Sequence, residues 1–241
     1  MQESVKAFPE AKPHLSPVQI FPNIYCVTGT VRLSRWIQAP RNMFIFKQGD
    51  SLCLVHSVRL NEDGLKELDK LGKVTDLVRI GWFHGMDDPF YLDRYQPTYW
   101  GLPGGQTNRK IQPHKKLEDG GAFPIPGSTV QIFTTTKRPE AVVRLESNGG
   151  ILLTCDAIMN LDGKGFGYNW LARVGLQLQR EPAVRSGPLW RKFCEPKVDD
   201  YRRIQTLSYR HLLSGHGDPV MNTAHLAVDK LIENEFGGQT T

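Results

Sequence analysis

Three short segments of the sequence place polar side chains directly after apolar runs. His84 and Asp88 lie in FHGMDDPF (83–90), Asp156 lies in GILLTCDAI (150–158), and His216 lies in LLSGHGDPV (212–220). Imidazole nitrogens and carboxylate oxygens are ligands for zinc, iron and manganese. A carboxylate buried at the end of a strand is costly unless it meets a cation or several hydrogen-bond donors. The segments therefore indicate a metal site built from strand ends.

Each segment also has a simpler interpretation when it is taken alone. His84 fits a hydrogen-bonded buried histidine, and Asp87 or Asp88 fits a helix cap before Pro89. His216 stands between two glycines, which let the backbone turn sharply and approach another group. The prediction of a metal site rests on the order of the three segments along the chain more than on any one of them.

The elements that must position these residues follow a mixed pattern. Strand-like runs at 24–29, 42–48 and 51–57 predict an antiparallel meander, and a second series at 128–135, 140–147 and 150–156 resembles the first. A helix is expected at 61–72, followed by a strand that ends at His84. Further helices are expected at 169–179, 198–207 and 222–237, whereas 101–128 is rich in glycine and proline and predicts a long loop.

Composition narrows the class of protein. The 241 residues are 39% hydrophobic, which excludes collagen, coiled coils and wholesale disorder, and 30 basic against 25 acidic side chains give a net charge of only +5. No apolar run approaches the roughly 20 residues of a membrane span, and the first residues lack the apolar core of a signal peptide. We expect a cytoplasmic protein with an N-terminal arm at 1–19, one domain at 20–241, and four reduced, mostly buried cysteines.

Taken in order, the segments resemble the metallo-β-lactamase superfamily. The likeness consists of a strand followed by H-x-x-x-D, a later strand ending in aspartate, and a strand ending in GHG before a terminal helix. It spans roughly residues 20–236 and is most specific in HLLSGHGDPV. The resemblance implies an α+β fold, a four-layer αβ/βα sandwich with metal ions at one edge. It also implies a hydrolase whose one or two zinc or iron ions acidify a water.

The metal-binding signature of the superfamily is incomplete in this chain, as in an uncharacterised branch that the sequence also resembles. In H-x-H-x-D-H, His84 and Asp88 match the first histidine and the aspartate, but Met86 and Pro89 replace the other two histidines. The next family histidine corresponds to Lys137, and a protonated lysine cannot ligate a metal. The two-metal centre of the superfamily is therefore not expected.

The resemblance still implies a reduced metal site. It leaves Asp88, Asp156 and His216 at one metal position and His84 nearby. We expect at most one zinc, iron or manganese ion, or a metal-free protein. Asp88 is the candidate to orient or deprotonate a water.

Two further residues stand where the family has site residues. His56 replaces an aspartate and either supports the site or is a buried structural histidine. Lys137 is either a surrogate cation for the carboxylates or part of a solvated turn before Pro139.

Three functions remain as alternatives. The first is a hydrolase-like protein that activates water against an unknown small substrate. The second is a catalytically inactive descendant that binds a small molecule or a protein partner in the old cleft. The third, nucleic-acid processing, is little supported by a charge of +5. We expect a small-molecule ligand and no membrane, and the pattern indicates no particular oligomeric state.

Overall fold

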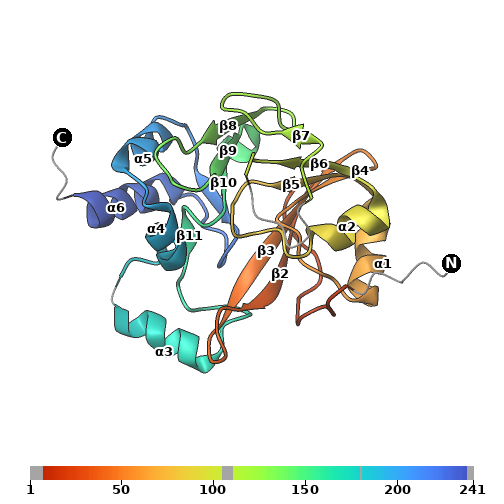
Figure 1. Cartoon of the computed structure of the whole chain (residues 1–241), viewed down its shortest axis with the longest axis horizontal. Coiled ribbons are helices and arrows are strands. Elements are labelled where there is room, and N and C mark those ends of the chain that lie inside the picture. Colours follow the sequence, from red (N-terminus) through yellow and green to blue (C-terminus); the bar gives the residue numbers. More distant parts are fainter. Residues whose placement is uncertain (1–7, 105–110, 180, 238–241) are drawn as a thin grey trace.

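The computed structural model describes residues 8–104, 111–179 and 181–237, and Figure 1 shows two β-sheets between two groups of helices. The first sheet has seven strands in the order of the chain. Its strands are β1 (Val18–Phe21), β2 (Ile24–Arg32), β3 (Gln38–Gln48), β4 (Ser51–Val55), β5 (Lys73–Arg79), β6 (Thr98–Gly101) and β7 (Lys115–Lys116). Strands β1 to β4 are antiparallel, as the meander predicts, and β4 to β7 are parallel.

The second sheet has four strands in the order β13-β10-β9-β8. They are β8 (Ser128–Ile132), β9 (Ala141–Leu145), β10 (Ile151–Thr154) and β13 (His211–Ser214). β8, β9 and β10 form an antiparallel meander, and β13 joins β10 in parallel. A small pair, β11 (Met159–Asn160) and β12 (Val184–Arg185), lies beyond the end of β10.

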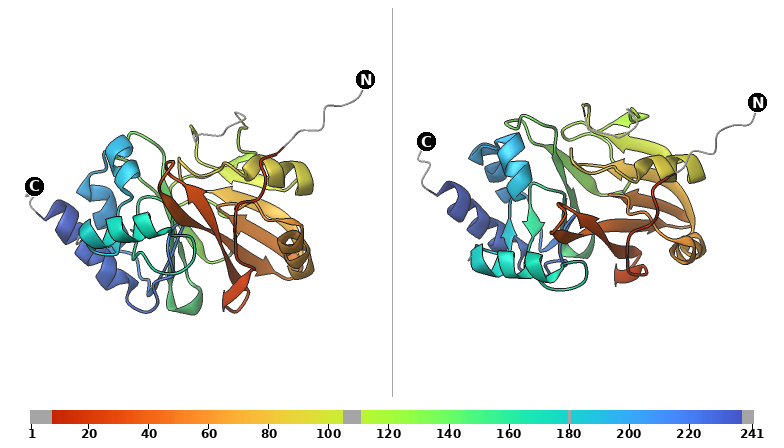
Figure 2. Two further views of the ribbon diagram at one scale, coloured as in Figure 1. Left: turned by 90° about the horizontal axis from the view of Figure 1, so that it is seen from below. Right: turned by 60° about the horizontal axis from the view of Figure 1, so that its bottom comes forward.

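Helices cover the outer faces of both sheets. α1 (Glu62–Leu71) and α2 (Asp88–Tyr95) pack on the first sheet, while α4 (Pro188–Cys194), α5 (Val198–Gln205) and α6 (Ala224–Phe236) pack on the second. α3 (Trp170–Gln179) lies apart from them, near the β2–β3 hairpin (Figure 1). The views of Figure 2 show the same division of the helices to opposite sides.

Three apolar clusters account for these layers. The central cluster joins the facing sides of the two sheets, with Phe44 and Val78 from the first and Val143 and Leu153 from the second. A second cluster fills the space between the first sheet and α1 and α2, and a third lies between the second sheet and α4 to α6. The architecture is therefore the four-layer αβ/βα sandwich that the sequence predicts.

The chain before β1 runs across the first sheet. His14 forms an isolated bridge with Gly29 of β2, and Leu15 N donates to Thr28 O at 2.8 Å. The His14 ring accepts a hydrogen bond from Asn61 N at 2.9 Å, next to the start of α1. The described part of the expected arm thus straps β2 to α1, and its last two residues already belong to β1.

Two short helices depart from the sequence expectations. α2 and α4 are eight and seven residues long, and both have proline in the first turn. The sequence analysis predicted neither helix, although it named Asp87 as a candidate cap before Pro89. Asp87 does occupy the N-cap position, but its side chain makes no cap hydrogen bond.

The long loop expected at 101–128 contributes side chains to the central apolar cluster. Leu117 is buried in the central cluster, and Phe123 and Ile125 pack against it, so the described part of the loop closes one end of the sandwich. Its residues 105–110 lie outside the described part.

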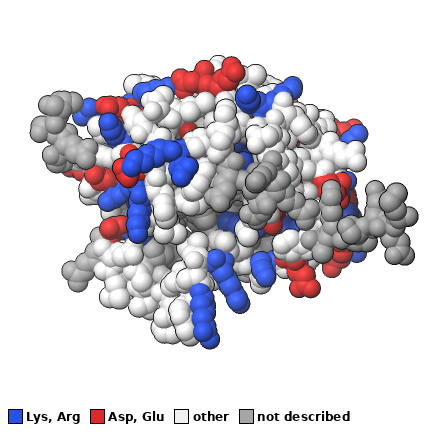
Figure 3. All heavy atoms as spheres, in the orientation of Figure 1, with Lys and Arg blue, Asp and Glu red and all other residues white. Residues whose placement is uncertain are grey.

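No helix in the described part of the chain is long and apolar enough to span a membrane. Basic and acidic side chains both occur across the face that Figure 3 shows.

Candidate functional site

Strand ends from both sheets converge at one edge of the sandwich. Asp156 follows β10 and His216 follows β13, and these strands are parallel neighbours that end together at Thr154 and Ser214. His84 lies in the loop after β5 of the first sheet. Because parallel strands present their carboxyl ends at one edge, residues distant in sequence meet there.

The side chains of His84, Asp156 and His216 form a compact group. The Nε2 atoms of the two histidines are 3.0 Å apart. Asp156 Oδ1 is 3.6 Å from His84 Nε2 and 3.2 Å from His216 Nε2. All three side chains are at most 10% exposed. The sequence named each of the three as a metal ligand, and the structure brings them together.

A backbone carbonyl fixes the tautomer of one imidazole. His216 Nδ1 donates to Pro40 O at 2.7 Å, so Nε2 is the ring nitrogen that faces His84 and Asp156. Asn42 holds the same loop from β3, since its side-chain amide donates to Ser214 O at 2.9 Å and to Gly217 O at 2.6 Å. The His216 ring is therefore oriented by the first sheet although its strand belongs to the second.

The GHG segment requires its second glycine. Gly217 has a φ of 80°, and a Cβ there would overlap the carbonyl oxygen of Asn160. A Cβ at Gly215 would lie 3.1 Å from His84 Cε1. The flanking glycines thus give the backbone freedom and close approach that the sequence pattern indicated.

Electrostatics favour an ionised Asp156 beside the two imidazoles. Burial alone would raise the pKa of Asp156, but the adjacent imidazoles of His84 and His216 outweigh it and hold that pKa below its ordinary value. Burial lowers the pKa of His84, and the neighbouring Asp156 offsets this only in part. An unprotonated imidazole and a carboxylate are the forms that bind metal ions.

A buried glutamate that the sequence analysis missed supports Asp156 from behind. Glu140 is fully buried and accepts hydrogen bonds from Asp156 N at 2.8 Å, Ala157 N at 2.9 Å and Trp82 N at 3.3 Å. Burial and the charge of Asp156 raise the pKa of Glu140 well above its usual value. The one sequence signal was an acidic residue opening the apolar run EAVVRL.

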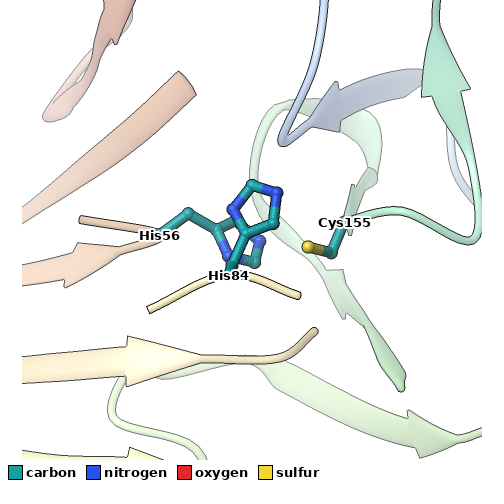
Figure 4. A group of neighbouring side chains, drawn as sticks. All are labelled: His56, His84 and Cys155. Carbon is teal, nitrogen blue, oxygen red and sulfur yellow. The ribbon is translucent and has the colours of Figure 1, made fainter. Parts of the chain in front are cut away.

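A second group of potential ligands shares His84. The ligand atoms of His56, His84 and Cys155 all lie within 4.8 Å of one another, and the same holds for His84, Asp156 and His216. Figure 4 shows the ring of His56 beside that of His84, with the sulfur of Cys155 pointing toward them. The His56 and His84 rings meet edge to face, with centroids 4.8 Å apart.

His56, which the sequence left as either a supporting or a purely structural histidine, is buried beside His84. It is 1% exposed, and neither ring nitrogen has a hydrogen-bond partner among the described residues. Burial, followed by the neighbouring His84, lowers its pKa well below the ordinary value. The pKa of the Cys155 thiol is raised, mainly by burial, so the thiol stays protonated. His56 is thus a neutral ring packed under His84.

A third group of neighbouring ligand atoms is formed by Glu140, Cys155 and Asp156, and Asp88 lies outside all three groups. Its carboxylate accepts hydrogen bonds from Ser57 Oγ at 2.6 Å and Tyr99 OH at 2.8 Å, and Oδ2 is 4.0 Å from Arg79 Nε. The expectation that Asp88 would share an ion with Asp156 and His216 is corrected accordingly. The buried Arg79 beneath the loop draws Asp88 away, because a buried guanidinium needs a carboxylate partner.

Lys137 also lies away from the cluster. Its ammonium is 2.6 Å from Glu195 Oε1, and both side chains are more than half exposed. The sequence left a solvated turn as the alternative to a surrogate cation, and the structure shows the solvated turn. The cations close to carboxylates in this region are Arg79, beside Asp88, and Arg41, which pairs with Asp87.

The spacing of the three donor atoms suits one metal ion. Two ligands, each about 2.0–2.1 Å from a tetrahedral zinc, are about 3.4 Å apart. The observed separations of 3.0, 3.2 and 3.6 Å bracket that value. Two imidazoles and one carboxylate also match the donors of catalytic zinc and iron sites.

The cluster forms the floor of a pocket of about 460 Å³. Its walls are mostly apolar and come from the β2–β3 hairpin, α3 and α4. Arg41 also lines it, on the side of the first sheet. A pocket of this size over a polar floor is the usual form of a small-molecule site.

Comparison with solved structures identifies the architecture. No protein-family model and no curated protein matches the sequence. The metallo-β-lactamase FIM-1 from Pseudomonas aeruginosa, solved in a mono-zinc form, is 14% identical with a TM-score of 0.57, over 95% of this chain and 98% of that chain. A metallo-β-lactamase from Erythrobacter litoralis is 14% identical with a TM-score of 0.59, over 90% and 92% of the two chains.

The protein has the metallo-β-lactamase fold. A flavo di-iron protein from Thermotoga maritima shares it, with 16% identity and a TM-score of 0.62, over 90% of this chain and 61% of that longer chain. The fold predicted from the resemblance is thereby confirmed. At these identities the likeness establishes the fold and not the activity, which depends on the residues of this chain.

Proposed function

We propose that this metallo-β-lactamase-fold protein is a hydrolase-like protein with a single-metal site formed by His84, Asp156 and His216. The observation that carries the proposal is the convergence of three donor atoms at 3.0 to 3.6 Å on the floor of a pocket. A zinc, iron or manganese ion at this site would supply a water acidified toward neutral pH.

The residues of the chain would prepare the site in distinct ways. Nδ1 of His216 donates to Pro40 O, so its Nε2 is the ring nitrogen available to an ion. Binding of an ion at His84 and His216 requires that both Nε2 atoms carry no proton. Asp156 brings the negative charge that offsets the ion, and Glu140 anchors its backbone.

The overlapping group of His56, His84 and Cys155 provides the internal control. Its thiol is protonated and deep in the core, whereas Asp156 and His216 line the pocket. We therefore expect Cys155→Ser to retain metal, and His216→Ala or Asp156→Asn to lower metal affinity at least tenfold.

The test is elemental analysis and metal titration of protein purified without added metal. Near-stoichiometric metal that is lost in His216→Ala and kept in Cys155→Ser supports the proposal. The reverse pattern would place the ion at Cys155 and overturn the ligand set. Hydrolysis of an ester and lactone panel in proportion to bound metal tests the activity itself.

One observation favours the alternative of a catalytically inactive binding protein. His84, Asp156 and His216 make close polar contacts with one another, which would give each a polar partner in a protein that holds no ion. Protein that stays metal-free in the titration, and still binds ligands in the pocket, would establish this alternative.

A further inference from the structure

The pocket above the cluster has apolar walls and a polar floor. The floor carries the polar groups of His84, Asp156, His216 and Arg41. The walls carry aliphatic side chains from three separate elements: Val31, Leu33 and Ile37 of the hairpin, Leu171 and Leu176 of α3, and Leu189 of α4. The site therefore has one polar end and a long apolar remainder.

Apolar side chains continue from the walls out to the surface. Leu33, Phe83, Met86 and Leu189 line the pocket and are also among the exposed large hydrophobic residues of the structure. Exposed apolar groups that adjoin a pocket mark a ligand or interaction site more often than scattered ones do. A small polar substrate would leave this rim without a partner.

α3 is apolar on both of its faces. Leu171, Gly175 and Leu176 face the pocket, while Trp170, Val174 and Leu178 recur at four-residue spacing on the outer face. Trp170 and Leu178 are 69% and 76% exposed. A helix with this many apolar side chains normally buries several of them, yet only Ala172 of α3 is buried here.

The attachment of α3 is local to one end. Asn169 donates to Trp36 O of the hairpin at 2.8 Å, and Arg173 donates to Gly163 O at 2.7 Å and Gly165 O at 2.6 Å. The Asn169 bond joins the start of the helix to the β2–β3 hairpin, and the Arg173 bonds tie its first turn to the loop that precedes it. The helix and hairpin together form the apolar mouth of the pocket.

We propose that the pocket binds an amphiphile: a hydrocarbon chain lies between α3, the hairpin and α4, and a carbonyl or carboxylate head reaches His84 and His216. This deepens the proposed function and rests on the same site, since it assigns the substrate class as acyl compounds with an extended chain. The polar floor argues for a ligand with a head group and against a purely apolar one.

Gly175 offers a sharp test of this assignment. It lines the pocket from α3, and a Cβ built there meets no atom within 4 Å. Gly175→Phe should therefore fill the space for the chain without disturbing the packing, and Gly175→Ala is the matched control. Neither change touches the metal cluster.

The experiment measures binding of hexanoate and decanoate by calorimetry, below their micellar concentrations, to metal-depleted and metal-loaded protein. We expect decanoate to bind at least tenfold more tightly than hexanoate, because each buried methylene adds to affinity. Gly175→Phe should weaken decanoate binding at least tenfold, and Gly175→Ala should change it less than twofold. Metal content and thermal midpoint should be the same in both variants.

Several outcomes would overturn the inference. Equal affinity for the two chain lengths, or unchanged binding in Gly175→Phe, would exclude the chain from the pocket. Concentration-dependent dimerisation abolished by Leu178→Ser, without decanoate binding, would show that a second copy covers the rim. Sedimentation with lipid vesicles but no binding of monomeric decanoate would assign the rim to a membrane surface.

The same data separate this inference from the proposed function. Chain-length-dependent binding in a protein that takes up no metal would retain the amphiphile site and remove the hydrolase. Stoichiometric metal without chain-length dependence would do the opposite.

Discussion

At the scale of single residues, buried partners decide which acidic side chains are free for chemistry. Asp156 faces two imidazoles, whereas Asp88, only 68 positions earlier in a similar place after a strand, faces a guanidinium. Burying Arg79 requires a compensating carboxylate nearby. Asp88 therefore helps to hold the loop that carries His84, through Arg79.

Replacing Asp88 tests this assignment. Asp88→Ala removes the carboxylate beside the buried guanidinium of Arg79 and the acceptor of the Ser57 and Tyr99 hydroxyls, and should lower the free energy of unfolding by about 3 kcal/mol. Metal content should not fall in the folded variant. Urea denaturation and elemental analysis provide the two readouts. Asp63→Ala, at an exposed carboxylate in the first turn of α1, is the control and should leave the midpoint nearly unchanged. Loss of metal with no loss of stability would return Asp88 to the metal site.

Lys137 gives the contrasting case of an exposed ion pair. Its partner Glu195 is also exposed, and such pairs contribute little to stability in water. Lys137→Met should change the free energy of unfolding of the metal-free protein by less than about 0.5 kcal/mol. A loss of 1 to 3 kcal/mol, on the order expected for an uncompensated buried carboxylate, would show that the ammonium reaches the cluster in solution.

At the scale of elements, loops between strands and helices hold the outer layers in place. Asp200 in the first turn of α5 is fully buried and accepts four hydrogen bonds from the backbone and hydroxyl groups of Thr134 and Thr135. These bonds tie the end of β8 to α5. The position of α5 in turn covers β10, from which Asp156 follows.

Asp200→Ala should therefore loosen the helical layer over the second sheet. Four hydrogen-bonding groups lose their acceptor, and we expect a loss of about 3 kcal/mol in the free energy of unfolding. Asp199→Ala is the matched control, because its neighbouring carboxylate is exposed and lies 3.7 Å from Arg202. Equal denaturation midpoints for the two variants would contradict the anchoring role.

At the scale of the whole molecule, the layered core buries all four cysteines. Burial raises the pKa of Cys26 and of Cys194 to about 12, and raises those of Cys53 and Cys155 well above the ordinary value. The thiolate is the reactive form of cysteine. The folded protein should therefore react slowly with iodoacetamide at pH 8 and take up four equivalents after unfolding in urea, as mass spectrometry would show.

The same shifts set the sign of an alkaline effect on stability. In the unfolded chain the thiols ionise near the ordinary pKa of 9.0, while in the folded protein they stay protonated. Because the folded-state pKa values are raised, the contribution to stability is complete below pH 9 and is lost as pH rises above it. Denaturation midpoints should fall between pH 8 and pH 10, and a constant midpoint would contradict burial of the thiols.

The sequence by itself was enough to identify the candidate site residues along the chain. His84, Asp156 and His216 were identifiable because each follows an apolar strand, and the glycines around His216 marked a tight turn that the φ of Gly217 confirms. The helices α1, α5 and α6 and the two meanders also followed from periodicity. α2 and α4 did not, because a helix of two turns that begins with proline shows no repeated apolar face.

Only the tertiary structure decided which of these residues share a site. Periodicity describes one element at a time, and it cannot show that Arg79 faces Asp88, that Glu195 faces Lys137, or that Glu140 lies behind Asp156. These pairings join positions 9 to 58 residues apart, in and beside the loops that connect strands and helices. The free energy of burying a charge is settled by its neighbours in space, so the partners of each carboxylate emerge only when the layers pack.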